Sequence, residues 1–398
     1  MQNRIIVIGA GYSGAIAAGR LAKRLRREDV AITLVNAEPD FVERVRLHQL
    51  AVGQELTPRP LSEMFAGTGV ELKLATVTAI DVDRKTVAVQ GADGPAELPY
   101  DTLVHALGST GNAGGVPGVA EHAHQIASRP GALRLRERLG RLAEGETVLV
   151  VGGGLTGLEF ATEVAETRPD LDVVLAARGE LGDWLSPKGR AHLRKVLDGL
   201  GVTVHEHMAV TGVEADRVTT ADGRTVPAAV TVWTTGFAAH PLNRATSLEL
   251  ADTGRVVVDE TMRSVSHPDV YAIGDAGHAL GAGDKPLRMS CASGTPMAWQ
   301  AADSIAARLT GGKLPTAHLK YFNQCISLGR KEGLIQFVTA DDRAVDRALT
   351  GRFAARYKEL VCKGAAWGVA HPTMGVPVRR RRAAADRAAA QETTRVAA

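Results

Sequence analysis

Two glycine-rich turns constrain the fold of this chain more than any other feature of its sequence. Both have the form Gly-x-Gly-x-x-Gly, both follow an apolar, strand-like run, and both precede a helical segment and a further strand. In such a unit the first glycine allows a tight turn, the second lets the backbone approach a pyrophosphate, and the third lets helix and strand pack closely. The glycines are Gly9, Gly11, Gly14, Gly152, Gly154 and Gly157.

One such turn is weak evidence, because a strand, a glycine turn and a helix can follow one another without binding a ligand. A second copy roughly 140 residues further along the chain makes the indication strong. The N-terminus of each following helix offers free N–H groups and the positive end of the helix dipole to a phosphate. We therefore expect an α/β fold with two Rossmann-like dinucleotide-binding domains.

Composition excludes several other classes of protein. The chain has 398 residues, which is enough for two or three domains. A net charge of +3 and an aromatic content of 4% give no indication of nucleic-acid binding. No apolar run is long enough to span a bilayer, and no signal peptide precedes the first strand, which begins at Arg4. We expect a cytoplasmic protein.

Cysteines and histidines do not form a recognisable metal site. Cys291, Cys325 and Cys362 lie far apart in the sequence and show no metal-ligand spacing. His205 and His207 share one face of a strand-like stretch, but no third ligand follows with the spacing of a zinc site. We expect no bound metal, and the sparse cysteines indicate a reducing compartment.

The ends of the second strands bear on which nucleotide each domain binds. In the first unit the position that accepts hydrogen bonds from the ribose is usually acidic; here it is Asn36, with Glu38 two residues later. In the second unit the position is Ala177, followed by Arg178. An acidic group would repel a 2′-phosphate, whereas an arginine can bind it with two hydrogen bonds. The second site therefore favours NADPH over NADH, unless Arg178 is only a solvated strand-end residue.

Four further stretches resemble motifs of the FAD-dependent pyridine-nucleotide oxidoreductases, a superfamily of flavoproteins with two dinucleotide-binding domains. They are "ATVTAIDVDRKTV", "YDTLVHALGS", "VTVWTTGF" and "RSVSHPDVYAIGDA". The resemblance covers about residues 4 to 310. It implies that FAD contacts the first glycine turn, Asn36, Val77, Gly108, Gly274 and Asp275, and that NAD(P)H contacts the second turn, Arg178 and Gly236.

The same resemblance implies a domain order in which the second nucleotide domain interrupts the first. We expect an FAD-binding domain in two parts, an NAD(P)H-binding domain between them, a small C-terminal interface domain and a disordered tail. The expected FAD-binding domain comprises residues 1–115 and 239–315, and the NAD(P)H-binding domain comprises residues 116–238. The expected C-terminal interface domain covers residues 316–378, and the expected tail covers residues 379–398.

Within the superfamily, three stretches are similar to type II NADH dehydrogenases: "LHQLAVG", "GGGLTGLEFATEV" and "YFNQCISLGRKEGLIQF". This similarity implies that Glu159 lies near the nicotinamide and the flavin. It also implies a quinone site formed by three glutamines on the helix after the last FAD motif. Here only Gln300 remains, because the other two positions are Pro296 and Ala301. We take Glu159 and Gln300 as the candidate catalytic residues.

Redox cysteines are missing where disulfide reductases of the superfamily carry them. The segment 39–53 instead contains Arg44, Arg46, His48 and Gln49. Arg44 is expected to bind a phosphate or to shape the acceptor pocket. Cys291 follows the last FAD motif and could approach the flavin, but we expect it to be a small buried residue without a partner. Electrons should therefore leave the flavin directly.

The C-terminal region leaves two interpretations open. Apolar residues from Phe353 to Trp367 recur on one face of an expected helix. That face could lie on a membrane surface, or it could dock on the chain itself or on a second copy in a homodimer. The arginines 379–382 could add attraction to anionic lipid, but charge runs are usually solvated.

Four functions remain open at this point. The first is an NAD(P)H:quinone or diaphorase-type oxidoreductase, and the second is an FAD oxidoreductase acting on one small biosynthetic substrate. The third is a reductase of a ferredoxin-type carrier, which would need a basic docking surface. The fourth is a flavoprotein that binds FAD only as structure, but it gives the second glycine turn no purpose.

Overall fold

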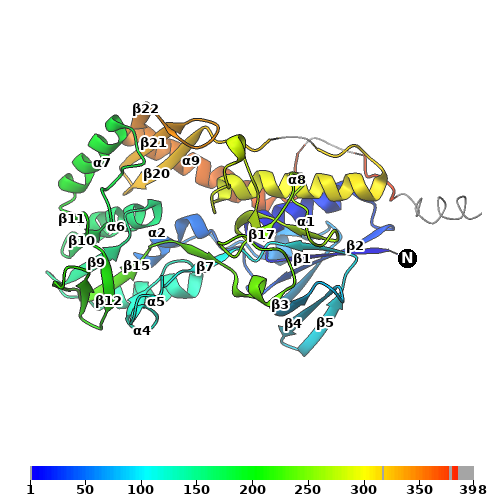
Figure 1. Cartoon of the computed structure of the whole chain (residues 1–398), viewed down its shortest axis with the longest axis horizontal. Coiled ribbons are helices and arrows are strands. Elements are labelled where there is room, and N and C mark those ends of the chain that lie inside the picture. The colour runs from blue at the N-terminus through cyan, green and yellow to red at the C-terminus, as the bar shows by residue number, and fades with distance from the viewer. Residues whose placement is uncertain (1, 316–317, 376–378, 384–398) are drawn as a thin grey trace, which may run out of the picture.

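The computed structural model describes residues 2–315, 318–375 and 379–383 (Figure 1). Its first sheet has the strand order β18-β6-β1-β2-β3-β4-β5, in which β18, β6, β1, β2 and β3 run parallel. Its bounds are β1 (Asn3–Ile8), β2 (Val30–Asn36), β3 (Val70–Asp81), β4 (Thr86–Gly91), β5 (Gly94–Pro99), β6 (Thr102–His105) and β18 (Val270–Ala272). Because β18 joins this sheet only after more than a hundred and fifty residues of other structure, the expected interruption of the FAD domain is confirmed.

Two long helices cover the first sheet. The helices α1 (Tyr12–Arg24) and α8 (Cys291–Thr310) pack along each other. Residues 5–8 of β1 are buried, as expected for a parallel strand covered on both faces. Alanines and Leu21 bury one side of α1 in the same core. Shorter helices follow β2: α2 (Leu47–Ala51) and α3 (Leu61–Met64).

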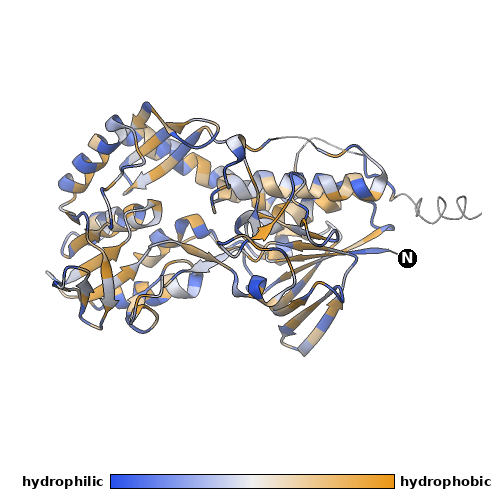
Figure 2. Cartoon of the chain, in the orientation of Figure 1, coloured by the Kyte–Doolittle hydropathy of each residue, from blue (hydrophilic) through white to orange (hydrophobic). Residues whose placement is uncertain are grey.

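The second sheet is parallel throughout and has the order β11-β10-β9-β15-β8. In Figure 2 its strands are largely hydrophobic, and the polar residues lie on the outer sides of the helices around them. The strands are β8 (Ala123–His124), β9 (Thr147–Val151), β10 (Asp172–Ala176), β11 (Thr203–His205) and β15 (Val230–Trp233). The helices are α4 (Val119–His122), α5 (Arg129–Leu139), α6 (Leu155–Thr167) and α7 (Pro187–Gly199). A small antiparallel sheet adds β12 (Val210–Val213), β13 (Arg217–Thr220) and β14 (Thr225–Pro227).

The helix starts differ in a way that bears on function. The helices α5 and α7 begin with a serine whose hydroxyl accepts a backbone N–H at 3.2 Å, Ser128 from Gly131 and Ser186 from Gly189. The helices α1 and α6 begin instead at Gly11 and Gly154, which offer no side-chain cap. Their first N–H groups are therefore left for another acceptor.

Two antiparallel strands form the neck between the domains: β7 (Ser109–Gly111) pairs with β16 (Phe237–Ala239). The remaining short elements surround the last FAD motif or lie in loops. They are β17 (Val256–Val257), β19 (Gly277–His278), η1 (Arg44–Arg46), η2 (Pro241–Ala245), η3 (Gly274–Ala276) and η4 (Ala282–Asp284).

The C-terminal unit consists of an antiparallel sheet and a helix, seen in orange tones at the upper edge of Figure 1. Its elements are β20 (Asn323–Leu328), β21 (Glu332–Val338), β22 (Ala344–Thr350) and α9 (Gly351–Ala370). The sheet packs on α6 and α7 of the second domain, and α9 packs on α1 of the first. The C-terminal unit thus joins the two nucleotide domains.

After α9 the chain returns to the first domain. Arg381 forms an isolated bridge with Leu25, and the backbone N–H of Ala383 donates to Asp29 at 2.8 Å. The sequence placed these residues in a disordered tail, whereas residues 379–383 lie against the first domain. Residues 384–398 of that expected tail lie outside the described residues. In the part of the chain that the structure describes, no helix is long and apolar enough to cross a membrane.

Candidate active site

Both glycine turns open into one cavity of about 2040 Å³. A pocket for one drug-sized ligand measures roughly 300–1,000 Å³, so this cavity has room for more than one ligand. Thirteen of the sixteen residues singled out from the sequence line it. They are Gly9, Gly11, Asn36, Arg44, Val77, Gly108, Gly152, Gly154, Glu159, Arg178, Gly236, Gly274 and Asp275.

The third glycine of each turn is needed for packing, as its place in the motif implied. A Cβ on Gly14 would overlap the carbonyl oxygen of Gly9, and a Cβ on Gly157 would overlap that of Gly152. By contrast, a Cβ on Gly11 or Gly154 would meet nothing within 4 Å. The middle glycines therefore leave open space at the helix N-termini, where a pyrophosphate would lie.

Asn36 holds the first glycine turn in place. Its Oδ1 accepts the backbone N–H of Ala10 at 2.8 Å, and its Nδ2 donates to the carbonyl oxygen of Glu38 at 2.7 Å. Both polar groups of the amide are therefore engaged with the backbone. The Glu38 side chain also lines the cavity and supplies the carboxylate that the position of Asn36 lacks.

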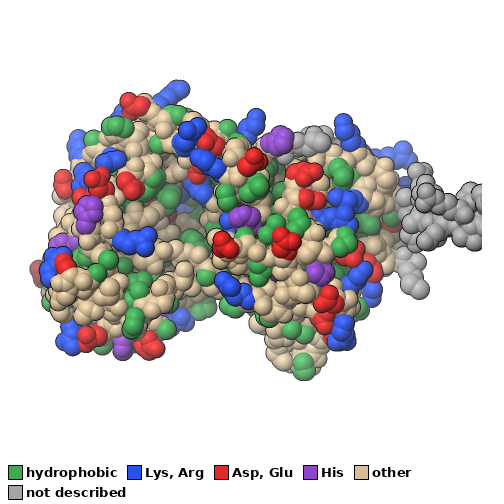
Figure 3. Space-filling view, viewed as in Figure 1, with side chains coloured by type: hydrophobic (Ala, Val, Ile, Leu, Met, Phe, Trp, Pro, Cys, Tyr) green, Lys and Arg blue, Asp and Glu red, His purple; other side chains and the backbone are tan. Residues whose placement is uncertain are grey.

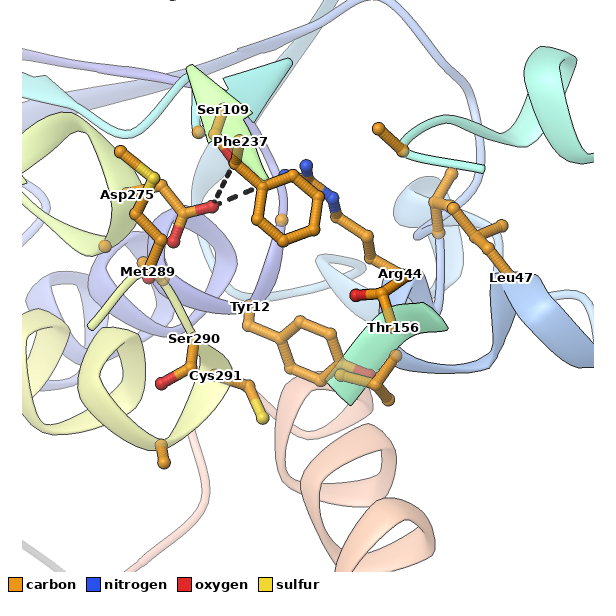
Figure 4. A pocket seen from close by; sticks show the side chains of 18 of the residues that line it. Tyr12, Arg44, Leu47, Ser109, Thr156, Phe237, Asp275, Met289, Ser290 and Cys291 are labelled. Carbon is orange, nitrogen blue, oxygen red and sulfur yellow. Dashed lines mark hydrogen bonds and ion pairs between the residues drawn. The ribbon is translucent and has the colours of Figure 1, made fainter. Parts of the chain in front are cut away.

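Arg44 reaches the last FAD motif across the cavity (Figure 4). Its Nη1 lies 3.4 Å from Oδ2 of Asp275, which also accepts a hydrogen bond of 2.6 Å from the Ser109 hydroxyl. The guanidinium lies over the Phe237 ring, 4.8 Å from its centre. Burial lowers the pKa of Arg44, with Asp275 acting against this effect. Its Nη2 is buried and has no hydrogen-bond partner among the described residues.

Glu159 is part of a buried cluster that spans three parts of the chain. Its Oε1 lies 2.9 Å from Nζ of Lys358 on α9 and accepts the backbone N–H of Ser327 on β20 at 3.1 Å. Its Oε2 lies 4.0 Å from Nδ1 of His48 on α2. All three side chains line the cavity. The C-terminal unit thus places the ammonium group of Lys358 beside Glu159, a candidate catalytic residue from the sequence.

The protonation states in this cluster follow from burial and pairing. Burial alone would raise the pKa of Glu159, but Lys358, His48 and the Ser327 N–H hold it below its usual value. Burial alone would lower the pKa of Lys358, but Glu159 raises it well above its usual value. Burial lowers the pKa of His48 to about 4 despite the nearby Glu159. At neutral pH the pair is therefore ionised and His48 is neutral.

Gln300, the second candidate catalytic residue, is not among the described residues that line the cavity. It is buried on α8, and its Nε2 donates to the carbonyl oxygen of Glu260 at 2.7 Å. Pro296, one turn earlier on the same helix, does line the cavity. The helix thus presents Pro296 rather than the remaining glutamine to a ligand.

The three cysteines converge on the cavity although they are far apart in the sequence. Cys291 begins α8, Cys325 lies on β20, Cys362 lies on α9, and all three line the cavity as free thiols. Burial raises the pKa of each thiol, that of Cys325 to about 11. At neutral pH the thiols are therefore protonated and weakly nucleophilic.

Arg178 lies at the exposed end of β10, where its side chain contributes to the cavity lining of the second nucleotide domain. His207, in the turn after β11, donates its backbone N–H to the carbonyl oxygen of Gly179 at 3.4 Å. Within the described ranges, no group of three or more His, Cys, Asp or Glu side chains is arranged to hold a metal, and this includes His205 and His207.

Sequence reasoning missed Lys358 and Tyr12. Lys358 is far from Glu159 in the sequence, and no local pattern connects the two. Tyr12 follows Gly11, stacks edge-on against Phe41, and has a buried hydroxyl with no partner in the described part of the chain. Its place within the first glycine turn, directly after Gly11, could have indicated from the sequence that Tyr12 lies at the nucleotide site.

Comparison with known proteins identifies the family. The family model described as pyridine nucleotide-disulphide oxidoreductase matches residues 3–306. This chain belongs to that family. An NADH dehydrogenase-like protein of Mycobacterium tuberculosis is 30% identical over 353 residues, covering 82% of this chain and 86% of the relative. A demethylphylloquinone reductase of Synechocystis is 25% identical and covers 82% and 84%.

A solved structure agrees with this assignment at the level of the fold. The NDH2 enzyme of Plasmodium falciparum, determined with NADH, has a TM-score of 0.78 and 15% identity, covering 94% of this chain and 97% of that one. The chain is therefore an FAD-dependent NAD(P)H oxidoreductase of the type II NADH dehydrogenase-like kind.

The residues present fit an FAD. Three buried polar atoms on the cavity wall lack partners within the described residues: Nη2 of Arg44, the Tyr12 hydroxyl and Nε2 of His48. Buried polar groups are normally hydrogen-bonded, so these atoms indicate a polar ligand. The uncapped N-terminus of α1 and the open space beside Gly11 suit its pyrophosphate. The family name refers to a disulfide, but no cysteine occurs in segment 39–53 of this chain.

Proposed function

We propose that this chain is an NAD(P)H:quinone oxidoreductase that uses FAD and no redox-active disulfide. One observation carries the proposal. Both glycine turns open into one cavity, its wall contains the Glu159–Lys358 ion pair, and segment 39–53, where disulfide reductases of the superfamily carry redox cysteines, has none. Bound FAD would supply a group that can accept a hydride from NAD(P)H and pass two electrons to an acceptor.

The residues of the first domain would bind and orient FAD. The N-terminus of α1 binds the pyrophosphate, Glu38 accepts hydrogen bonds from the ribose hydroxyls, and the backbone near Val77 contacts the adenine. Gly274 and Asp275 hold the ribityl region, and Arg44 adds a positive charge from the opposite wall. Gly108 lets the backbone turn into the neck strand β7, since its φ of 77° suits a residue without a side chain.

The residues of the second domain would bind NAD(P)H and favour NADPH. The N-terminus of α6 and Gly236 bind the nucleotide phosphates. Arg178 is exposed at the end of β10 and follows Ala177 rather than an acidic residue. A guanidinium at this place pairs with a 2′-phosphate, and no carboxylate at position 177 opposes it.

The Glu159–Lys358 pair would act on the acceptor. The ammonium of Lys358 lines the cavity and can donate to a quinone carbonyl oxygen, which becomes more negative as electrons arrive. Glu159 keeps that ammonium charged in a buried place and holds its position. Quinone as the acceptor is supported by the relative from Synechocystis, a demethylphylloquinone reductase, and by the apolar side chains Trp299, Phe322, Val361, Trp367 and Met374 on the cavity wall.

An apolar stripe next to this region would contact a lipid surface, in which quinones dissolve. Phe353, Leu360 and Trp367 recur at seven-residue spacing on α9 and are 65%, 67% and 51% exposed. The opposite face of α9, with Ala354, Cys362, Ala366 and Val369, is buried on the molecule. The exposed stripe therefore has the two-sided character of an interfacial helix.

Two observations bear on the alternatives. Pro296, which stands at one of the three glutamine positions, lines the cavity from α8, and this favours a specialised small-molecule acceptor as the second candidate. On the face shown in Figure 3, basic and acidic side chains are interspersed, so that face lacks the broad basic surface expected of a ferredoxin reductase.

The test is a steady-state assay of the purified FAD-loaded protein with NADPH and a menaquinone analogue, with and without anionic lipid vesicles. We expect quinone reduction that rises when vesicles are added. Reduction of a ferredoxin instead, lost at high salt, would assign the third function. Flavin reduction without any quinone turnover would leave the specialised small acceptor.

A further inference from the structure

Helix α6 carries three carboxylates along one face: Glu159, Glu163 and Glu166. Their spacing of four and three residues places them as successive neighbours on a helix. Glu159 lines the cavity, whereas Glu166 lies near the surface with its side chain 17% exposed. Glu163 lies between them, and none of the roles above uses it.

The middle carboxyl is buried without a counter-charge. Glu163 is 0% exposed, and among the described residues it forms no ion pair. One of its oxygens accepts a hydrogen bond from the Gln54 amide, and the other has no partner in the described part of the chain. A buried carboxylate in such a place is unfavourable, so the neutral form is stabilised.

The charged and titratable groups around Glu163 come from two elements. Glu159 and Glu166 are on α6 itself, and Arg330 approaches from the turn between β20 and β21. Burial raises the pKa of Glu163 to about 7, the Gln54 amide and Arg330 act in the opposite direction, and the two carboxylates raise it further. At neutral pH this carboxyl can therefore both give and take a proton.

Each end of the row has a partner suited to proton exchange. At the inner end, Glu159 contacts the Lys358 ammonium at 2.9 Å, and Lys358 lines the cavity. At the outer end, Glu166 accepts the backbone N–H of Arg330 and lies 3.8 Å from Nζ of Lys331, whose side chain is 77% exposed. The row thus runs from the cavity wall towards the surface.

The proposed function requires a supply of protons from water. In the overall reaction, NAD(P)H and a quinone become NAD(P)⁺ and a hydroquinone. The hydride supplies two electrons and one proton, whereas two O–H bonds form, so one further proton must come from solvent in every turnover. Lys358, which the acceptor carbonyl would meet, lies on the cavity wall with its side chain 17% exposed.

We propose that Glu163 relays this second proton. It would take the proton from Glu166 near the surface and pass it to the Glu159–Lys358 pair, so that it acts on the acceptor only through that pair. Lys358 gives its proton to the acceptor oxygen, Glu163 restores the proton through Glu159, and Glu166 recharges Glu163 from water. No electrons move along the row, and one proton enters for each quinone reduced. The proposal rests on the proposed function, because a quinone that ends with two O–H groups needs this proton.

The first test is Glu163→Gln, which keeps the size and the contact with Gln54 but cannot release a proton. We expect flavin bleaching by NADPH to stay within about twofold, because hydride transfer needs no proton from solvent. We expect stopped-flow reoxidation by a menaquinone analogue at pH 7 to slow by about tenfold or more, in line with the loss of a proton-transfer group. Glu137→Gln, the same change at an exposed site on α5, is the matched control.

The pH profile separates a proton role from a packing role. In the wild type, quinone-dependent reoxidation should fall as the pH rises through about 7, because Glu163 loses its proton there. Glu163→Gln should lack this inflection. Gln54→Leu should move it to higher pH, because the Gln54 amide lowers the pKa of Glu163. Infrared titration should show a protonated carboxyl band near neutral pH that Glu163→Gln lacks.

The outcomes distinguish the two levels of the proposal. If the wild type reduces quinones and Glu163→Gln keeps both its rate and its pH inflection, the relay is wrong and the proposed function stands. If the wild type reduces no quinone, the proposed function fails and the relay fails with it. A missing infrared band in the wild type would also overturn the relay, whatever the acceptor.

Discussion

At the scale of single residues, the ion pair of Glu159 and Lys358 bears on both stability and the proposed chemistry. Both side chains are buried and oppositely charged, and each shifts the other towards its charged form. Such a pair adds little beyond its desolvation cost, but removing one partner leaves an isolated buried charge. Replacing one partner should therefore change the free energy of unfolding more than the net contribution of the intact pair would suggest.

We expect Lys358→Met to destabilise the protein by about 3–5 kcal/mol at pH 7 and to raise the pKa of Glu159, because its largest counter-charge is lost. Since Lys358 lowers that pKa in the folded state, the contribution of Glu159 is present at neutral pH and is lost as the pH falls through its depressed value. Urea unfolding at pH 7 and pH 4 measures both effects. A double variant that also carries Glu159→Gln should recover most of the loss, and no recovery would contradict a paired role.

A second prediction at this scale concerns Arg178. Replacing it with alanine should raise the KM for NADPH about tenfold and leave that for NADH within about twofold, because only NADPH carries the 2′-phosphate. Arg141→Ala, which removes an exposed arginine far from the cavity, should change neither value. Equal effects on the two nucleotides would show that Arg178 does not recognise the 2′-phosphate.

Individual residues differ in how far the sequence predicted them. Asp275, Glu159 and the first two glycines of each turn, which local motifs singled out, line the cavity, because each motif has one backbone geometry wherever it occurs. Lys358 could not be predicted in this way, since only the packing of α9 against α1 and the C-terminal sheet brings it to Glu159. Gln300 followed from a register comparison alone, and the sequence did not reveal that its amide turns towards Glu260.

At the scale of elements, we expect the two glycine turns to act as separate binding units. We expect Gly157→Ala to weaken NAD(P)H binding while FAD remains bound, because the added Cβ would overlap the Gly152 carbonyl and come within 2.8 Å of the Thr234 hydroxyl. The matched change Gly14→Ala should reduce FAD content instead. Flavin absorbance per protein and the rate of bleaching by NADPH measure the two losses. Loss of FAD in both variants would contradict their independence.

The secondary structure could largely be predicted for elements whose apolar residues all face the same core. The strand runs 5–8 and 148–151 are buried as expected, and both are followed by the expected helices. The helix α9 has two apolar faces with different partners, so its sequence pattern could not decide between docking and membrane contact. The structure shows that one face is docked on the molecule, and the exposed face remains for the proposed lipid contact.

At the scale of the whole molecule, three units contribute to one cavity. The first domain provides Arg44 and Asp275, the second provides Glu159 and Arg178, and the C-terminal unit provides Lys358 and Cys362. Because the C-terminal sheet packs on the second domain while α9 packs on the first, the cavity depends on all three. This also explains how three cysteines so distant in sequence converge on one site without a disulfide.

The most direct test of direct electron transfer is an anaerobic titration of the FAD-loaded protein with NADPH, followed by flavin absorbance and then by addition of a quinone. We expect one equivalent of NADPH per FAD to bleach the flavin fully, because no disulfide takes up further electrons, and quinone to restore the oxidised spectrum. A requirement for two equivalents would reveal a second redox centre among the thiols. A flavin that NADPH and NADH both fail to bleach would contradict the oxidoreductase mechanism itself.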